Sequence, residues 1–320
     1  YYSTTGNNAN WVQLTSGGWQ AGSGTGAWNI SWFANNEKTI TFDTQGGTGN
    51  VSYEAVPGQT LTSPTGSFTK PGYTFNGWNT PARMPNANHT VYANWIPNTY
   101  NIAFNGNGST GGSTGGMTCA YGTAYNLTSN GFTKNGYNFV CWNTNAGGTG
   151  TNYNNGASVS NLTTVNNATV TLYAQWAPIT YTVKYNPEGG TGTTADSLHT
   201  FDQDKALTVN GFSRYGYTFD GWAVTSGGSR AYDNGQTVKN LTNVQGATFD
   251  LYARWEPITY YVSYDVNSTS GHSGTMNNST HQYGIPAQLN YNVYSKLGYT
   301  FLGWATSQQG ANAGEVTYAD

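Results

Sequence analysis

The stretch GYTFDGWAV, at residues 216–224, decides the fold of this chain because it returns at a nearly fixed period. Its other copies are GYTFNGWNT (72–80), GYNFVCWNT (136–144) and GYTFLGWAT (298–306). A second phrase follows three of them, as VYANW (91–95), LYAQW (172–176) and LYARW (251–255). A sequence of this kind is built from copies of one unit, which favours a structural or binding role over a single catalytic pocket.

The spacing of the tryptophans gives the size of the unit. Trp142 and Trp222 are 80 residues apart, and Trp222 and Trp304 are 82 apart. Such a length suffices for a small self-folding domain. Trp78 and Trp142 are only 64 residues apart, so the first copy lacks about 17 residues between its two phrases. We expect the segment that this copy lacks to be a peripheral excursion.

The periods divide the chain into five predicted segments. Residues 1–36 are interpreted as the C-terminal remnant of a preceding repeat, since GAWNISWFANNEKTITF (26–42) parallels GATFDLYARWEPITYYVSY (246–264). Four repeats follow: a shortened first repeat (37–98), a full second repeat (99–179), a full third repeat (180–258) and a fourth repeat (259–320) that stops before its closing phrase. We therefore interpret the chain as a piece of a longer protein.

The pattern within a repeat predicts strands. In TYTVKYN (180–186), Tyr181, Val183 and Tyr185 alternate with polar residues, which is typical of a half-buried strand. A Gly-rich loop and a returning strand are expected next, followed by an extended crossover and the Gly-Tyr phrase as a third strand. The closing strand 168–176 alternates again, and no stretch shows ten residues of helical period. The predicted class is all-β or nearly so.

The linkers between repeats are short. Three residues with a central proline separate each closing phrase from the next strand, and the prolines are Pro97, Pro178 and Pro257. Proline restricts its own φ and the preceding residue, so adjacent repeats are expected to abut with little slack. Neighbouring repeats of the same chain are the first partners that the sequence predicts.

Composition excludes several functions. Only 8% of residues are charged and the net charge is −3, so no basic surface for nucleic acid is expected. No apolar run is long enough to span a membrane. No Ser/His/Asp grouping recurs between repeats, so we expect no enzyme, no catalytic residue, no metal site and no cofactor. Low charge with abundant Asn, Thr, Ser, Gly and Tyr is typical of an exported, protease-tolerant surface protein.

The two phrases, in this order and at this spacing, closely resemble the internalin B-repeat, also called the Listeria–Bacteroides repeat. The resemblance covers residues 37–320. It implies a compact β-grasp-like module with little helix, repeated in tandem in extracellular bacterial proteins as spacers or receptor-contacting domains. It also implies structural core anchors in place of catalytic residues: Trp78, Trp95, Trp142, Trp176, Trp222, Trp255 and Trp304. Cys141 departs from the pattern, because the other copies have glycine there.

The cysteines and histidines are the residue types that could form a disulfide or bind a metal ion. Cys119 and Cys141, the only cysteines, fall in one repeat on strands that we expect to be neighbours. In an exported protein they form a disulfide candidate, the alternative being two separate buried thiols. The four histidines, which show no ligand spacing, are expected at the surface: His89, His199, His272 and His281.

These observations favour a structural extracellular protein, a segment of a stalk, fibre or filament that acts as a semi-rigid spacer. The alternative is an adhesin whose repeats bind glycan, mucin or a host receptor. The Gly-rich loops share little between repeats, which favours the spacer, and the ligand-binding residues of an adhesin stay unknown. Exposed strand edges also allow self-association into a filament.

Overall fold

A computed structural model of the protein describes residues 11–13, 19–21 and 37–319. Strands make up 42% of it and helix 2%, so the predicted nearly all-β class is confirmed. The β-grasp likeness stays a prediction. Within the proposed remnant at 1–36, two strands are described, β1 (Trp11–Gln13) and β2 (Trp19–Ala21), which pair antiparallel. The rest of that interpretation lies outside the described residues.

The chain forms two compact units. The first contains Tyr1–Asn101, Thr118–Tyr125 and Val159–Val170, and the second contains Ile102–Met117, Asn126–Ser158 and Thr171–Asp320. The first repeat lies wholly in the first unit. The third and fourth repeats lie wholly in the second unit, and the third repeat is complete.

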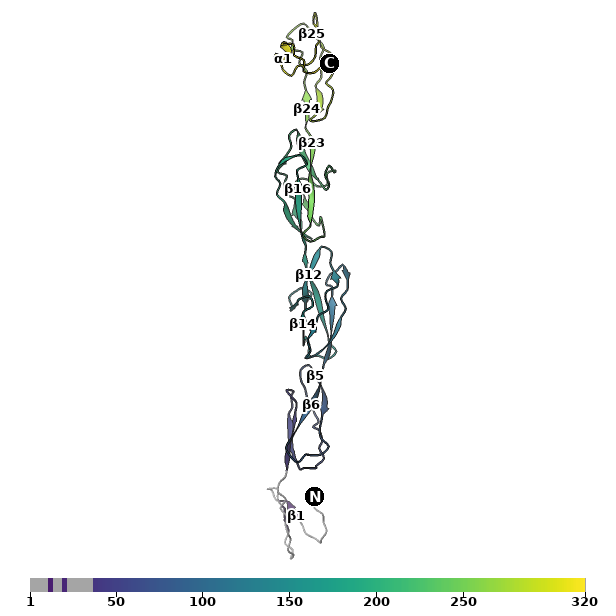
Figure 1. The fold of residues 1–320 in the computed structure, drawn as a ribbon, viewed down its shortest axis with the longest axis vertical. Coiled ribbons are helices and arrows are strands. Elements are labelled where there is room, and N and C mark those ends of the chain that lie inside the picture. The colour runs from purple at the N-terminus through teal and green to yellow at the C-terminus, as the bar shows by residue number, and fades with distance from the viewer. Residues whose placement is uncertain (1–10, 14–18, 22–36, 320) are drawn as a thin grey trace. The chain divides into compact units, whose positions relative to one another are not determined.

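The third repeat is built on a four-stranded sheet in the order β18-β16-β23-β21. The strands are β16 (Thr180–Asn186), β18 (Ser197–Thr200), β21 (Tyr217–Ala223) and β23 (Thr248–Pro257). The first and last strands, β16 and β23, run parallel in the centre, as can be followed in Figure 1, and the two outer strands pair antiparallel. Two short ladders complete the repeat: β17 (Thr191–Gly192) with β20 (Phe212–Ser213), and β19 (Lys205–Ala206) with β22 (Thr237–Val238).

The first repeat has the same sheet, in the order β4-β3-β6-β5. Its strands are β3 (Lys38–Asp43), β4 (Val51–Ala55), β5 (Tyr73–Trp78) and β6 (His89–Pro97). Again the first and last strands are parallel neighbours. The residues that this repeat lacks are therefore not needed for the central sheet.

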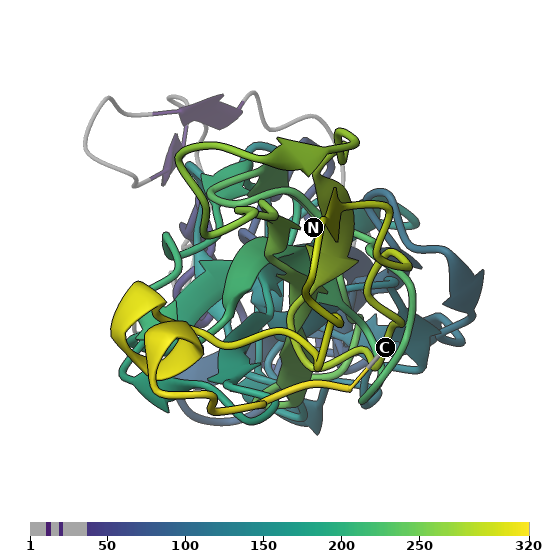
Figure 2. The same ribbon diagram turned by 90° about the horizontal axis from the view of Figure 1, so that it is seen from above.

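The second repeat has the strands of the third in the same order with one strand added, whereas the fourth repeat has counterparts of β16, β17, β18 and β20, followed by a helix. The second contains β7 (Thr99–Asn105), β8 (Gly111–Gly112), β9 (Met117–Ala120), β10 (Tyr125–Asn126), β11 (Phe132–Thr133), β12 (Tyr137–Asn143), β13 (Asn152–Tyr153), β14 (Ser158–Val159) and β15 (Thr169–Pro178), with a sheet in the order β13-β12-β15-β7-β9. The fourth contains β24 (Thr259–Val262), β25 (His272–Ser273), β26 (Ser279–Gln282), β27 (Ser295–Lys296) and the helix α1 (Gln308–Asn312). The side chain of Ser307 caps α1, which is yellow in Figures 1 and 2, by accepting a hydrogen bond from the N–H of Gly310.

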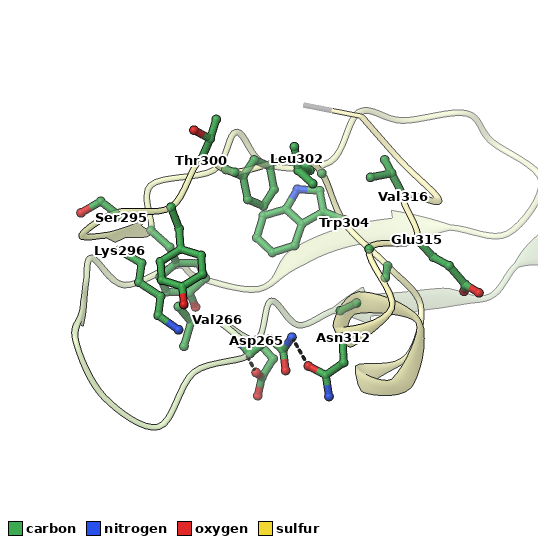
Figure 3. A pocket seen from close by; sticks show the side chains of 18 residues that line it. Asp265, Val266, Ser295, Lys296, Thr300, Leu302, Trp304, Asn312, Glu315 and Val316 are labelled. Carbon is green, nitrogen blue, oxygen red and sulfur yellow. Dashed lines mark hydrogen bonds between the residues drawn. The ribbon is translucent and has the colours of Figure 1, made fainter.

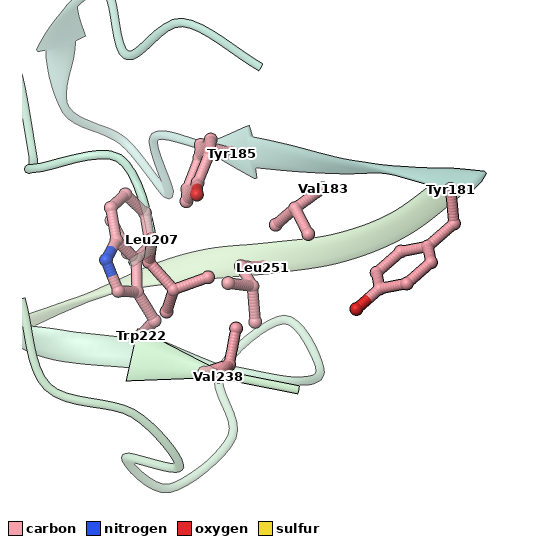
Figure 4. Close-up of a cluster of buried hydrophobic side chains, with 8 residues drawn as sticks. Tyr181, Val183, Tyr185, Leu207, Trp222, Val238 and Leu251 are labelled. Atoms are coloured by element: carbon pink, nitrogen blue, oxygen red, sulfur yellow. The ribbon is translucent and has the colours of Figure 1, made fainter. Parts of the chain in front are cut away.

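The core of the third repeat lies against the parallel pair. Tyr181, Val183 and Tyr185 of β16 are buried, which confirms the predicted alternation. They pack with Leu251 of β23 and with Trp222 (Figure 4). The Trp222 ring lies between three aromatic rings, at centroid distances of 4.8 Å (Tyr185), 4.9 Å (Phe219) and 6.2 Å (Phe212). The repeat is thus held by an aromatic cluster around one fully buried tryptophan.

A β-bulge in the Gly-Tyr phrase sets the direction of Trp222. The register between β21 and β23 shifts between Phe219 and Gly221. Gly221 has a φ of 144°, and a Cβ there would lie 2.7 Å from the carbonyl oxygen of Tyr232. Glycine thus permits both the backbone conformation and the close approach. The second repeat keeps the register shift with Cys141 at this position, so the bulge does not itself require glycine.

The expected peripheral excursion is only partly peripheral. In the third repeat it contributes Val238, which is buried in the core cluster and pairs with Lys205. The shortened first repeat fills the equivalent place with Met84, whose N–H donates to the carbonyl of Gln59 at 2.8 Å. The prediction of a wholly peripheral segment was wrong. The first repeat lacks most of the segment but keeps one apolar side chain, Met84, paired with the crossover.

Candidate functional site

The junctions between consecutive repeats are the feature that recurs in the same form three times. Each closing strand ends at the predicted linker proline, and the next opening strand begins two residues later. One residue therefore connects the strands at each junction: Asn98, Ile179 and Ile258. The linkers are shorter than predicted, because the proline pairs within the sheet, for example Pro178 opposite Tyr137, where no N–H is required.

The connecting residue is bonded to both repeats through its backbone. The N–H of Ile179 donates to the carbonyl of Gly136 at 3.0 Å, and its own carbonyl accepts from the N–H of Phe201 at 2.9 Å. Asn98 makes the same pair of bonds with Gly72 and Tyr121, at 2.9 and 2.8 Å. Ile258 makes them with Gly216 and Tyr283, both at 2.9 Å. At all three junctions, the N–H and the carbonyl of the connecting residue are therefore both hydrogen-bonded.

A glycine and an aromatic ring from the two repeats pack together beside these bonds. Gly136 has a φ of 74°, and the ring of Phe201 occupies the space where a Cβ would be. Phe201 is 8% exposed and meets Tyr137 edge-on at 5.9 Å. The same close approach joins Gly72 to Tyr121 and Gly216 to Tyr283. The Gly-Tyr of the repeated phrase therefore receives an aromatic residue of the next repeat.

Polar side chains differ from one junction to the next. The Tyr137 hydroxyl donates to Asp202 at 2.8 Å, and Asn240 donates to the same carboxylate at 2.8 Å. The hydrogen bonds from Asn240 and Tyr137 lower the pKa of Asp202, and the bond to Asp202 raises the pKa of Tyr137. At the preceding junction the Asn98 amide instead donates to the carbonyl of Thr164 at 2.8 Å. The three junctions thus have in common the backbone hydrogen bonds of the connecting residue and the glycine–aromatic contact.

The predicted tryptophans occupy two kinds of position. Trp142 and Trp222 are fully buried, and Trp78 and Trp304 are half-buried at the same point of the phrase. The tryptophans of the closing phrase are half-buried, and each indole N–H donates to a loop carbonyl at 2.9 Å: Trp95 to Thr44, Trp176 to Gly106 and Trp255 to Pro187. The closing strand is therefore fastened to the loop that follows the opening strand.

The predicted disulfide is absent, since Cys119 and Cys141 are both free and buried. They lie on β9 and β12, and β15 and β7 come between those strands in the order of the sheet. Three strand spacings amount to roughly 14 Å, about twice the Cα separation that a disulfide spans. The prediction failed because it took the two strands for neighbours. Burial raises the pKa of both thiols, which keeps them protonated.

Two histidines are buried, contrary to the expectation for all four. His199 is 1% exposed, stacks on Tyr181 at 5.6 Å and makes a 2.9 Å hydrogen bond with the Ser197 hydroxyl. His281 of the fourth repeat is 5% exposed and has the same surroundings. Cys119 stands at this position in the second repeat. The signal was the recurrence of histidine two residues after a serine in SLHT and STHQ.

His89 and His272 are exposed, as expected. Within residues 37–319, no group of three or more His, Cys, Asp or Glu side chains is placed to bind a metal ion. The same described part of the chain has no helix long and apolar enough to cross a membrane.

Fold and junctions together define a tandem-repeat protein of nearly all-β modules joined end to end along the sequence. The model of the Listeria-Bacteroides repeat domain matches the chain four times, at residues 39–94, 100–175, 181–253 and 260–318. The chain belongs to this family, which confirms the resemblance inferred from the two phrases.

Two curated relatives come from Evansella cellulosilytica. One, named as a putative Gly-rich membrane protein, is 27% identical over a match of 270 residues; the match covers 76% of this chain and 28% of the relative. The other, named as a putative membrane protein, is 30% identical over a match of 154 residues; the match covers 44% of this chain and 22% of the relative. The chain thus spans about a quarter of the length of the curated relatives that it matches.

Substituting Gly136 with alanine should loosen the junction to the third repeat. Gly156 in the same repeat is the matched control, because its φ is 70° but nothing lies within 4 Å of the missing Cβ. Both variants should lose roughly 1–2 kcal/mol for the left-handed conformation. Gly136→Ala should lose about 1–3 kcal/mol more, because the methyl group displaces the Phe201 ring. Hydrogen exchange at the amides of Ile179 and Phe201 measures this, and equal effects of the two variants would refute the contact.

The two cysteines should titrate as free thiols. In the folded chain, a disulfide reagent should react slowly with Cys119 and Cys141, because both are buried and protonated at neutral pH. After unfolding without reductant, two thiols per chain should react at once. A count near zero in the unfolded chain would restore the disulfide.

The third repeat should lose stability in mild acid through His199. Burial, with a smaller contribution from Lys205, lowers the pKa of His199 below its usual value. The unfolded chain therefore binds more protons than the folded chain once the pH falls below about 6.5, and stability decreases from there downward. His199→Cys, which copies Cys119 of the second repeat, should reduce this dependence. Exchange of the β16–β18 amides between pH 7 and pH 5 tests it; equal pH slopes in both proteins would contradict it.

Proposed function

We propose that the chain is a structural segment of an extracellular bacterial protein, in which the repeats serve as a semi-rigid spacer. The observation that carries the proposal is the threefold recurrence of one junction: a connector bonded on both sides and an aromatic ring packed on a glycine. A string of independent domains would not need the same contact at every boundary.

The energetics of the junction support stiffness. Each backbone hydrogen bond contributes about 1 kcal/mol, and each edge-on aromatic pair adds about 0.5–1.5 kcal/mol. Bending a junction such as that of Ile179 would break two such bonds and separate Phe201 from Tyr137. Because only one residue connects the strands, no slack is available to preserve these contacts in a bent form. Length would then increase with repeat number, by roughly 30–40 Å per module of this size.

The location at the cell surface is part of the proposal. It is supported by the low charge of the chain and by the two relatives named as membrane proteins, of which the chain matches only a part. We also propose that these residues carry no catalytic activity and bind no cofactor. The partners that we propose beyond the chain itself are a glycan, a host receptor or further copies of the chain in a filament.

An adhesin is the alternative, and one surface feature favours it. The outward tyrosine of the closing phrase recurs in three repeats, as Tyr92, Tyr173 and Tyr252. Tyr92 is mostly exposed, whereas the other two are half-buried. Exposed tyrosine rings are suited to stacking on sugars. The alternative is weaker because these three side chains do not share one environment.

Small-angle X-ray scattering of the whole chain tests the spacer. The wild-type scattering should fit a narrow range of conformations, because the junctions limit bending. A variant with Gly-Gly-Ser-Gly inserted after Ile179 should fit a broader range, since the Phe201 N–H can then no longer be held beside Gly136. The same insertion within the exposed Asn145–Gly150 loop is the control and should change little.

Indistinguishable scattering from the two insertion variants and the wild type would show that the junctions already bend freely, and the spacer would be rejected. Binding of the whole chain to a glycan array at micromolar concentration, lost on Tyr92→Ala, would instead support the adhesin.

A further inference from the structure

The chain enters and leaves the third repeat at opposite ends of one pair of strands. The connector Ile179 directly precedes β16, and the connector Ile258 directly follows β23. β16 and β23 are parallel neighbours over five residue pairs. A pull along the chain therefore draws β16 toward its own first residue and β23 toward its own last residue. The two strands can separate under such a pull only by sliding past each other.

The direction of the pull decides how strongly paired strands resist it. When two strands slide lengthwise, all the hydrogen bonds between them are strained at the same time. When two antiparallel strands are pulled apart from adjacent ends, their bonds break one after another, and each bond contributes only about 1 kcal/mol. Sliding therefore requires a larger force than opening from one end for the same number of bonds.

Backbone hydrogen bonds extend the pairing back to the first residue of β16. The N–H of Gly246 donates to the carbonyl of Thr180 at 2.8 Å, and the N–H of Thr182 donates to the carbonyl of Ala247 at 2.9 Å. The second repeat has the same two bonds at 2.7 and 2.8 Å: Asn167 to Thr99, and Asn101 to Ala168. A pull on the connector therefore reaches bonded residues at once.

Side chains also join the end of β16 to β23. The side-chain amide of Asn186 donates to the carbonyl of Leu251 at 3.2 Å and to the carboxylate of Asp250 at 3.1 Å. The indole N–H of Trp255 donates to the carbonyl of Pro187, directly after β16, at 2.9 Å. If β23 slides toward its last residue, Trp255 moves away from Pro187. These bonds therefore oppose the same movement as the backbone bonds.

The turn that accepts the indole hydrogen bond is restrained. In the third repeat Pro187 restricts its φ, and in the first repeat the N–H of Gln45 donates to the Asp43 carboxylate at 2.8 Å. Figure 3 shows the corresponding turn of the fourth repeat, where the N–H of Asn267 donates to Asp265 at 2.7 Å. The closing strands of the first and third repeats are thus bonded to a turn of fixed conformation.

The shortened first repeat keeps the parallel pair. It lacks about 17 residues between its two phrases, but β3 and β6 still run parallel, and the Trp95 indole N–H still donates to the carbonyl of Thr44 at 2.9 Å. The two short ladders of the third repeat have no counterpart strands within residues 37–98. The part common to the short and the full repeat is therefore the part that a pull would load.

We propose that the parallel pair is a mechanical clamp, so that a repeat containing it resists unfolding when the chain is pulled along its length. This function goes beyond the spacer and takes from it only the source of the tension, because a segment between a cell surface and a distant partner is pulled from both ends. Force reaches the pair through the covalent connector even where a junction bends. A flexible array in the scattering experiment would therefore leave the clamp intact.

Single-molecule force spectroscopy of the whole chain, held at its two ends, tests the clamp. The repeats should unfold in separate steps at forces that already straighten an unfolded chain. Unfolding of residues 180–258 should lengthen the chain by roughly 220–250 Å and unfolding of residues 37–98 by roughly 165–195 Å, the extended length less the size of the folded repeat. A chain that lengthens smoothly, without these steps, would overturn the proposal.

The matched variants are Asn186→Ala and Asn210→Ala. The Asn210 side chain makes two hydrogen bonds with the backbone of Phe212, at 2.9 and 3.0 Å, in the connection between β19 and β20 and outside the parallel pair. Both variants lose two hydrogen bonds, so both should lose similar stability toward urea. At constant force, Asn186→Ala should shorten the lifetime of the third repeat roughly tenfold, whereas Asn210→Ala should stay within about twofold of the wild type. Equal shortening would show that the resistance lies outside the pair.

A change in the direction of the pull gives an independent test on the folded chain. Handles attached through Tyr215→Cys and Glu256→Cys, both at exposed positions, load the antiparallel pair of β21 and β23 from one end. The native thiols, Cys119 and Cys141, are buried away from the handles. The lifetime of the third repeat at the same force should fall by about tenfold or more, because the bonds now break one at a time. Equal lifetimes in the two directions would refute the clamp.

Discussion

Each complete repeat depends on the parallel pairing of its first and last strands. In the third repeat the pairing joins residues 66 positions apart, such as Thr182 and Thr248, and in the first repeat it joins residues 49 apart, such as Ile40 and His89. Closing such loops costs entropy, which burial of Val183, Tyr185 and Leu251 against the sheet offsets. Because the entropic cost of closing a loop varies only with the logarithm of its length, the costs for the two repeats differ by a few tenths of a kcal/mol. This explains why the connection can shorten while the sheet keeps its order.

The same pairing determines the junctions. The closing strand lies in the interior of its sheet, and at the junctions to the second and third repeats the chain continues from it after one residue into the interior strands β7 and β16 of the next sheet. Ile179 is therefore hydrogen-bonded to Gly136 of the second repeat and to Phe201 of the third repeat. The glycine of the repeated phrase acquires a second role here, beyond its turn conformation, as the surface on which the next repeat packs.

The sequence predicted the elements that repeat and missed those that depend on which strands are neighbours. Alternation in TYTVKYN was enough to predict the buried face of β16, because each side chain of a strand points to one side. The disulfide required the order of the strands in the sheet, which separates β9 from β12, and no local pattern contains that order. His199 and Cys119 were missed for a related reason. Each fills the same pocket, beside Tyr181 and Tyr100 respectively, and position in the repeat was a better guide to burial than residue type.

The glycine–aromatic contacts could not have been predicted either, because Tyr121, Phe201 and Tyr283 lie outside both phrases. All three aromatic residues occupy the same position of the repeat, directly after the returning strand. That position is recognisable only from the glycine that each ring contacts in the structure. The proline was predicted as a linker and lies in a strand, because a sheet end that needs no N–H suits proline.

The buried tryptophan of the phrase explains why a repeat can receive its closing strand last. The indole N–H groups of Trp142 and Trp222 have no hydrogen-bond partner among the described residues, which costs about 1–3 kcal/mol each. Burying roughly 150–250 Å² of aromatic side-chain surface contributes about 4–6 kcal/mol, so burial of the tryptophan ring stabilises the fold despite the unpaired N–H. All the aromatic partners of this tryptophan precede the closing strand in the sequence. The cluster can therefore form before that strand is added, and the fourth repeat has the same cluster, with Trp304 at 4.8 Å from Tyr264 and 4.9 Å from Phe301.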